Sequence, residues 1–260
     1  MFQSGIFSGK KALITGGGSG IGFGIAKILL ELGADVMIAS RKKERLTAAQ
    51  QALSQYGNCA TAVLDVRELS DVERVMEEIQ HLWGQLDILV NNAGGQFPAA
   101  AESITPKGWL AVINNNLNGT WWVTSAAAKV FFIPQKRGTV INIIANIFRG
   151  FPGMAHTGAA RAGVDNLTKS LAIEWVTHNI RINSIAPGVI QSSGLDQYPP
   201  ELLQSINSTI PMKRTGSVED VAWLTAFLAS PMAGYITGET IYVDGGQRLW
   251  GNIWQIPDPQ

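Results

Sequence analysis

The stretch that decides the fold is TGGGSGIG, residues 15–22. It directly follows KALIT (11–15), a short apolar run typical of a buried strand, and it precedes a helical pattern over residues 21–32. Its glycines satisfy the spacing T-G-x-x-x-G-x-G rather than G-x-G-x-x-G. Glycines at a strand-to-helix turn allow close backbone approach, and the helix N-terminus offers unpaired N–H groups to an anion. A flexible glycine turn is the alternative, but the context favours a pyrophosphate cradle made by Thr15, Gly16, Ser19, Gly20, Ile21 and Gly22.

Outward from this stretch, β-branched runs alternate with longer amphipathic segments. Strands are expected at residues 11–15, 35–39, 61–65, 86–91, 139–144, 181–186 and 240–244. Helices are expected at 21–32, 42–56, 69–83, in two stretches within 107–133, from 156 to about 178, and at 218–228. Runs such as VMIA are apolar on both faces, as in a parallel sheet that is covered on each side. The pattern predicts one α/β domain over residues 1–260, a doubly wound Rossmann-type fold with helices on both faces of a central parallel sheet. The long irregular region 188–211 is predicted to be a substrate lid.

The composition limits the possible partners. The chain has 20 Lys and Arg against 20 Asp and Glu, so nothing favours nucleic acid or an anionic membrane as the main partner. No apolar run approaches the roughly 18–20 residues that span a bilayer, and the N-terminus does not resemble a secretory signal. Together with a single cysteine, these features predict a cytoplasmic protein, and no metal site is expected.

The end of the second strand indicates which dinucleotide binds. In IASRKKERL (38–46), Ser40 and Arg41 stand where a fold that prefers NAD places an acid against the ribose 2′-hydroxyl, and Lys42 and Lys43 follow. Cations and a hydroxyl suit a 2′-phosphate better than a bare ribose. A solvated start of the next helix is the alternative for Lys43. We therefore expect NADPH, with NADH less favoured.

At this point the chain resembles the short-chain dehydrogenase/reductase family over nearly its whole length. The resemblance is carried by TGGGSGIG (15–22), LDV (64–66), NNAG (91–94), NNNLNG (114–119), INSIAPG (182–188) and TGETIYVDGG (237–246). It implies that the cofactor is contacted by Asp65 and Val66 near the adenine, by Asn91, Ala93 and Gly94 along its length, and by Pro187, Gly188, Ile190 and Ser192 near the nicotinamide. It also implies a homodimer or homotetramer.

The catalytic set of this family is Asn, Ser, Tyr and Lys, and the chain departs from it. Asn116 matches the asparagine, but Thr157 stands at the tyrosine position and Arg161 at the lysine. The serine position falls on Ala145 or Asn146. The chain is similar to trans-2-enoyl-CoA reductases and, more distantly, to 2,4-dienoyl-CoA reductases, on the stretches IASRKKERL, GGQF (94–97), KGW (107–109) and HTGAARAG (156–163). In that subgroup a small hydroxyl residue commonly replaces the tyrosine.

This replacement suits the reduction of an unsaturated thioester. Interconversion of an alcohol and a carbonyl needs an acid–base group with a pKa near neutrality, whereas conjugate reduction mainly needs donors for an enolate oxygen. Thr157 and Arg161 are four residues apart and would share one helix face. We expect Arg161 to hold the nicotinamide ribose, Thr157 or a water to donate to the thioester oxygen, and Asn116 to position a water.

The predicted activity is therefore NADPH-dependent reduction of a 2-enoyl-CoA or dienoyl-CoA, with an acyl-CoA-like small molecule as the partner. Two alternatives stay open. One is an alcohol or ketone dehydrogenase of the same family, and the other is a cofactor-binding protein without turnover. A solvated helix turn is the alternative for Thr157 and Arg161.

Overall fold

The computed structural model describes residues 2–3, 5–192 and 206–250. Within these residues seven parallel strands form one sheet in the order β3-β2-β1-β4-β5-β6-β7. Their bounds are β1 Lys11–Thr15, β2 Asp35–Ser40, β3 Cys59–Val63, β4 Ile88–Asn91, β5 Gly138–Ile143, β6 Ile180–Pro187 and β7 Thr240–Val243. In the centre, Ile14 of β1 is in register with Ile38 of β2 and Val90 of β4. The strand order reverses beside β1, which is where open sheets of this kind bind ligands.

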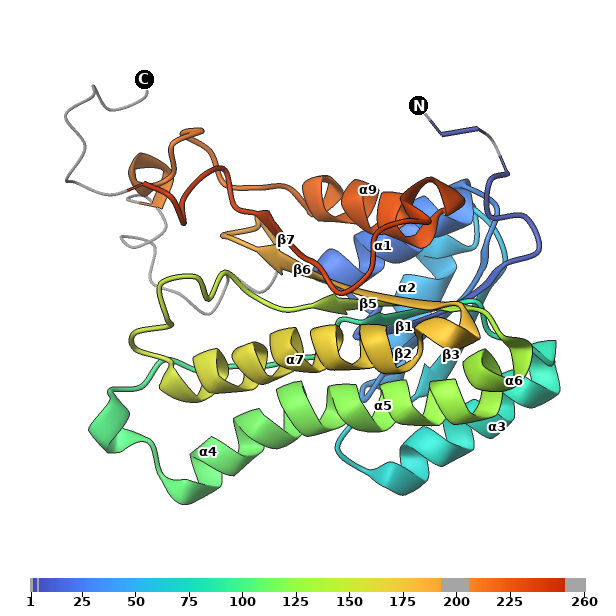
Figure 1. Cartoon of the computed structure of the whole chain (residues 1–260), viewed down its shortest axis with the longest axis horizontal. Coiled ribbons are helices and arrows are strands. Elements are labelled where there is room, and N and C mark those ends of the chain that lie inside the picture. Colours follow the sequence, from blue (N-terminus) through green and yellow to red (C-terminus); the bar gives the residue numbers. More distant parts are fainter. Residues whose placement is uncertain (1, 4, 193–205, 251–260) are drawn as a thin grey trace.

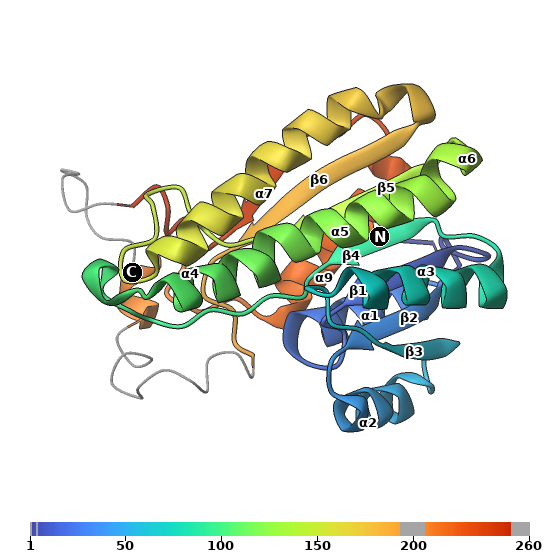
Figure 2. The same cartoon turned by 90° about the horizontal axis from the view of Figure 1, so that it is seen from below.

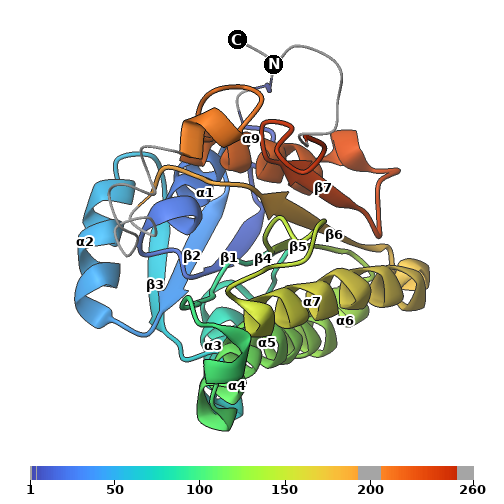
Figure 3. The ribbon, with the colours of Figure 1, turned by 90° about the vertical axis from the view of Figure 1, so that its left-hand side faces the viewer.

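Helices cover both faces of the sheet (Figures 1, 2 and 3). On one face lie α1 (Gly20–Glu31), α2 (Lys43–Leu53) and α9 (Val218–Ala229). On the other lie α3 (Leu69–Trp83), α7 (Ala155–Glu174) and the long helical segment from Pro106 to Gln135. Successive side chains of a strand point to opposite faces of the sheet, so β1 contributes to the hydrophobic core on both faces. Ile14 packs in the core beneath α1, and Leu13 packs in the core beneath α3.

The segment from Pro106 to Gln135 is one helical rod rather than two separate stretches. It runs through α4 (Pro106–Ile113), a π turn η2 (Asn114–Asn118), α5 (Gly119–Ala127), a second π turn η3 (Ala128–Phe132) and α6 (Ile133–Gln135). Thr105 caps its start by accepting a hydrogen bond from Gly108 N, and Pro106 occupies the first turn. A π turn inserts one residue into the helix, so the side chains that follow it change face.

Two other expectations need adjustment. The third strand is Cys59–Val63, not residues 61–65, because Cys59 is in register with Val36 of β2. Leu64, Asp65 and Val66 therefore continue beyond the strand. Of the predicted lid at 188–211, residues 193–205 lie outside the described residues. None of the helices in the described ranges is long and apolar enough to cross a membrane.

The packing of α1 against α9 depends on Gly24. A Cβ added to this buried glycine would overlap Val218 Cγ1 at the start of α9. Gly24→Ala should destabilise the protein by about 1–3 kcal/mol through overpacking, which exceeds the gain of about 1 kcal/mol in helix propensity. Urea unfolding of Gly24→Ala, Val218→Ala and the double variant measures the coupling. An equal cost of Gly24→Ala in both backgrounds would show that this contact does not limit the packing.

Candidate active site

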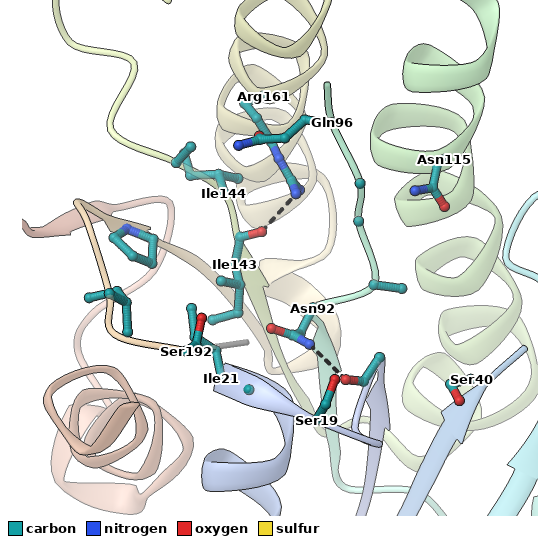
Figure 4. Close-up of a pocket in the computed structure, with 18 of the residues that line it drawn as sticks. Ser19, Ile21, Ser40, Asn92, Gln96, Asn115, Ile143, Ile144, Arg161 and Ser192 are labelled. Carbon is teal, nitrogen blue, oxygen red and sulfur yellow. Dashed lines mark hydrogen bonds between the residues drawn. The ribbon is translucent and has the colours of Figure 1, made fainter. Parts of the chain in front are cut away.

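A cavity of about 780 Å³ opens at the carboxyl ends of the central strands (Figure 4). Most of the residues predicted to contact a cofactor line it. These are Gly16, Ser19, Gly20, Ile21, Ser40, Arg41, Val66, Ala93, Gly94, Arg161, Pro187, Gly188, Ile190 and Ser192. Six predicted site residues do not line it: Thr15, Gly22, Asp65, Asn91, Asn116 and Thr157. The positions of these six show how the site is built.

Thr15 and Gly22 do not line the cavity, but their contacts fix the conformation of the glycine turn. The Thr15 hydroxyl accepts hydrogen bonds from the backbone N–H groups of Asn92 (3.1 Å) and Ala93 (3.0 Å). The Asn92 amide donates to the carbonyls of Thr15 (3.1 Å) and Gly16 (3.2 Å). Gly16 has φ +68°, and a Cβ on Gly22 would lie 2.5 Å from Gly16 O. Only glycine fits either position, so the loop after β4 holds the turn against the start of α1.

One end of the cavity, beside β2, gathers cations and a hydroxyl. The Ser40 Oγ atom is buried without a hydrogen-bond partner, while Arg41, Lys42 and Arg45 line the wall beside it. Lys43 does not line the cavity, so the second lysine of the motif is not part of it. Arg45 was missed from the sequence, although its spacing of four residues from Arg41 was the available signal.

Asp65 does not line the cavity, although it is close enough to Arg41 for the two charges to interact. Arg67 donates to both of its carboxylate oxygens, with Arg67 Nε at 2.8 Å from Oδ1. This pairing holds the pKa of the Asp65 carboxyl below its usual range. Val66, the next residue, does line the cavity. The cationic end therefore contains no carboxylate from the described residues.

Asn91, predicted to lie along the cofactor, is buried and does not line the cavity. Its amide donates to Thr124 Oγ1 (2.7 Å) and Asn142 Oδ1 (2.9 Å) in the core beneath α5. Asn142 in turn donates to Thr168 of α7 (2.8 Å). Asn92 is the asparagine of this motif that lines the cavity. Residues at adjacent positions at the end of a strand face opposite sides, and the motif alone does not tell which one faces the ligand.

At the other end of the cavity lies Arg161, a buried cation. Its side chain is 8% exposed, and its Nη1 donates to the Ile143 carbonyl at 3.0 Å, as Figure 4 shows. Its Nε is buried without a partner, and no carboxylate of the described residues forms an ion pair with it. Burial lowers the pKa of Arg161 to about 10, so the guanidinium is still charged at neutral pH. A Cβ on Gly94 would collide with its Nη2, so this glycine makes room for the cation.

Asn116 and Thr157 are fully buried. The Asn116 amide donates to the carbonyls of Gly95 (2.7 Å) and Val112 (2.8 Å), and its oxygen accepts from Gly95 N (3.3 Å). Thr157 Oγ1 lies 3.5 Å from Nδ1 of His156, whose ring packs edge-on against Phe97. The structure therefore brings Arg161 to the cavity but not Thr157. Asn116 supports the loop that carries Gly94 and Gly95.

Four amide side chains that were not selected from the sequence line the cavity: Asn92, Gln96, Asn115 and Gln247. The position of Gln96 in the stretch GGQF was the available signal for that residue. Asn115 lies in the π turn η2, directly before Asn116. Asn146, one of the two candidates for the serine position, also lines the cavity, and its amide donates to Asp244 Oδ2 at 3.1 Å. Ala145, the other candidate for the serine position, also lines the wall.

The remaining wall near Arg161 is apolar, with Ile144, Phe151, Met154 and Ile206. Among the described lining residues there is no Asp, Glu, His, Cys or Tyr, and the charged ones are Arg41, Lys42, Arg45 and Arg161. Such a cavity can bind an anionic dinucleotide and stabilise negative charge on a bound molecule. Its described wall offers no group that exchanges a proton near neutral pH.

Comparisons with known proteins agree with this picture. A family model described as enoyl-(acyl carrier protein) reductase matches residues 16–248. The chain is 40% identical to the probable 2,4-dienoyl-CoA reductase of Bacillus subtilis (strain 168), over 92% of this chain and 97% of that protein. It is 36% identical to the 3-oxoacyl-(acyl-carrier-protein) reductase of Thermotoga maritima, over 92% and 97%. Among solved structures it is similar to the citronellol catabolism dehydrogenase of Pseudomonas aeruginosa PAO1, with a TM-score of 0.86 and 35% identity over 95% and 98% of the two chains.

The uncompensated charge of Arg161 should reduce the stability of the protein without a ligand. Because burial lowers its pKa to about 10, the charged form is disfavoured in the folded state at all pH values below that pKa. Arg161→Met should therefore raise the free energy of unfolding at pH 7 by about 1–3 kcal/mol. Urea unfolding measures this, with Lys107→Met at an exposed position of α4 as the control, expected within about 0.5 kcal/mol of wild type. A loss of stability in Arg161→Met would show that the bond to Ile143 outweighs the cost of burial.

Proposed function

The chain belongs to the short-chain dehydrogenase/reductase family of oxidoreductases, and on that premise we propose that it reduces α,β-unsaturated acyl thioesters with NADPH. The substrate would be a 2-enoyl-CoA or a 2,4-dienoyl-CoA. The observation that carries this proposal is the cavity wall around Arg161, which combines a permanent buried cation with an amide and with no described acid–base group. The similarity to the Bacillus subtilis protein adds support.

The residues present fit a phosphorylated dinucleotide. The turn holds Gly16 (φ +68°) and Gly20 (φ +54°) in the left-handed region that favours glycine, and the N–H groups at the start of α1 would face the pyrophosphate. At the cationic end, the unpaired Ser40 hydroxyl with Arg41 and Arg45 would hold a 2′-phosphate. Arg161 would donate to the hydroxyls of the ribose next to the nicotinamide. When bound, NADPH would supply a hydride to the conjugated carbon of the substrate.

The chain itself would stabilise the charge that this transfer creates. As the double bond is reduced, negative charge moves to the thioester oxygen. The Arg161 guanidinium and the Gln96 amide both line the cavity, and they would be the donors that hydrogen-bond that oxygen. The carbon next to the carbonyl then takes a proton from water. Thr157, the donor expected from the sequence, is not on the wall, and Asn116 would act through the Gly94–Gly95 loop that it supports.

Activity on a substrate panel tests the proposal. NADPH oxidation should occur with crotonyl-CoA, 2-decenoyl-CoA or 2,4-decadienoyl-CoA and not with simple alcohols or ketones. Arg161→Met should lower kcat by about 100-fold or more, as loss of an oxyanion donor does, whereas Thr157→Val should change it by less than about threefold. Between about pH 6 and pH 8.5 kcat should be flat, because the pKa of Arg161 is about 10 and the described wall contains no Asp, Glu, His, Cys or Tyr.

Other outcomes of the panel select the alternatives. Turnover of alcohols with a pH profile that shows a titrating base would indicate an alcohol or ketone dehydrogenase. Tight binding of NADPH without turnover of any substrate would indicate a binding protein. Equal activity in Arg161→Met and wild type would contradict the assigned site even if the family is right.

Preference for NADPH should depend on the cationic end of the cavity. Arg41→Gln and Arg45→Gln each remove a charged donor and should raise KM for NADPH about tenfold, while KM for NADH changes little. Lys43→Gln is the matched control, since Lys43 carries the same charge beside the site but does not line the cavity. Steady-state kinetics with both cofactors decide the point. An equal rise in KM for NADPH and NADH in the arginine variants would argue against a 2′-phosphate site.

A further inference from the structure

A second cavity, here called the basal cavity, lies at the opposite edge of the sheet. It has a volume of about 600 Å³ and lies at the amino-terminal ends of the strands. Its wall includes Lys10 before β1, Asp87 before β4, Thr139 in β5 and Arg181 in β6. The cofactor cavity is at the carboxyl ends of the same strands, so the two do not share a lining residue. Nothing in the proposed reaction uses this second cavity.

The basal cavity carries an excess of positive charge. Its described charged residues are Lys10, Arg137, Arg181 and one acid, Asp87. Asp87 is buried, and its Oδ1 is contacted by both Lys10 Nζ and Arg137 Nε, each at 3.2 Å. Its Oδ2 accepts from the backbone N–H of Lys11 and from Gln85. One carboxylate is thus shared by two cations and its oxygens are already engaged, so it cannot neutralise the third cation.

Arg181 is that third cation, and it has only neutral partners among the described residues. It donates to Thr139 Oγ1 (3.2 Å), to the Ser230 carbonyl (3.3 Å) and to the Ile236 carbonyl (3.4 Å). These distances are at the long end for hydrogen bonds. Partial burial lowers the pKa of Arg181, because desolvation disfavours its charged form. A carboxylate or phosphate would match its guanidinium fork and offset that cost.

Most of the remaining wall is apolar, with Asn179 and Thr237 as polar members, and it is partly open to solvent. Ile6 and Phe7 contribute from the N-terminal segment, and Pro231 from the turn after α9. At the rim, Val176 is 50% exposed and Tyr235 is fully exposed. A simple oxyanion such as phosphate would fill only a small part of this space. A ligand that uses both the charge and the wall has an anionic head and an apolar body.

We propose that the basal cavity binds a small amphipathic oxyanion, with its carboxylate or phosphate head beside Arg181 and its apolar body against Ile6 and Val176. This site is separate from the proposed reaction and does not depend on it. A carboxylate and a phosphate share the property that matters for the head: each carries a negative charge on two or more oxygen acceptors. The experiment distinguishes between ligands with these two heads.

Isothermal titration calorimetry of the full-length protein saturated with NADPH tests the proposal, using octanoate, acetate, 1-octanol and inorganic phosphate. Octanoate should bind saturably at one site. Acetate lacks the apolar body and 1-octanol lacks the head, so each should bind about tenfold or more weakly. Arg137→Gln and Arg181→Lys should each weaken octanoate about tenfold, the second because lysine keeps the charge but loses the fork. Arg74→Gln, the same type of change outside the cavity, should leave the affinity unchanged.

Val176→Ser, a change at an exposed rim position, tests the apolar wall without disturbing the core and should also weaken octanoate. Several outcomes would overturn the proposal. One is an absence of saturable octanoate binding to the wild type. Another is octanoate binding that survives in Arg137→Gln, Arg181→Lys and Val176→Ser but is lost in Arg161→Met, which would place octanoate in the cofactor cavity. Phosphate binding as tight as octanoate would rule out the apolar body.

Discussion

A charge removed from water has to be stabilised by groups that the fold holds in place. Arg161 is such a charge, and the segments at the carboxyl ends of the central strands are arranged around it. One carbonyl, from Ile143 at the end of β5, meets its guanidinium directly. Gly94 has no side chain, which leaves room for the guanidinium. The Asn116 amide donates to the Gly95 carbonyl and so connects the next residue to the long helix. The strand end, the loop and the helix are thus positioned around a cation that lacks a described carboxylate.

The same requirement explains why the chain can depart from the usual catalytic residues of its family without losing the architecture. A fixed cation needs no partner that accepts its proton, so the tyrosine and serine positions are free to hold Thr157 and Ala145 or Asn146. The proposed reaction accordingly relies on stabilisation of negative charge rather than on proton transfer. Residual instability from a poorly compensated charge is a common feature of sites that are complete only when a ligand binds.

Much of the fold could be read from the sequence, because the βα alternation and the glycine turn follow from periods and steric limits that act locally. The positions of Ser40 and Arg41 also followed from spacing. What could not be read is which of two adjacent residues faces the cavity. Asn91 and Asn92 differ by one step at the end of a strand, and Asn115 and Asn116 differ by one step in a π turn. Arg45, four residues after Arg41, and Gln96, in the stretch GGQF, belong to motifs already quoted from the sequence, but neither motif alone shows that these side chains line the cavity.

The π turn η2 has a further consequence for the long rod beneath the sheet. Three consecutive asparagines, 114–116, occupy the point where one extra residue widens the helix. If the extra residue moves along by one place, α4 and α5 keep their relative orientation, and only the residue that is passed over changes face, by about 100°. Within residues 114–116 that residue is always an asparagine. The run of identical side chains therefore lets the π turn shift by one place while the side chain presented there remains a carboxamide.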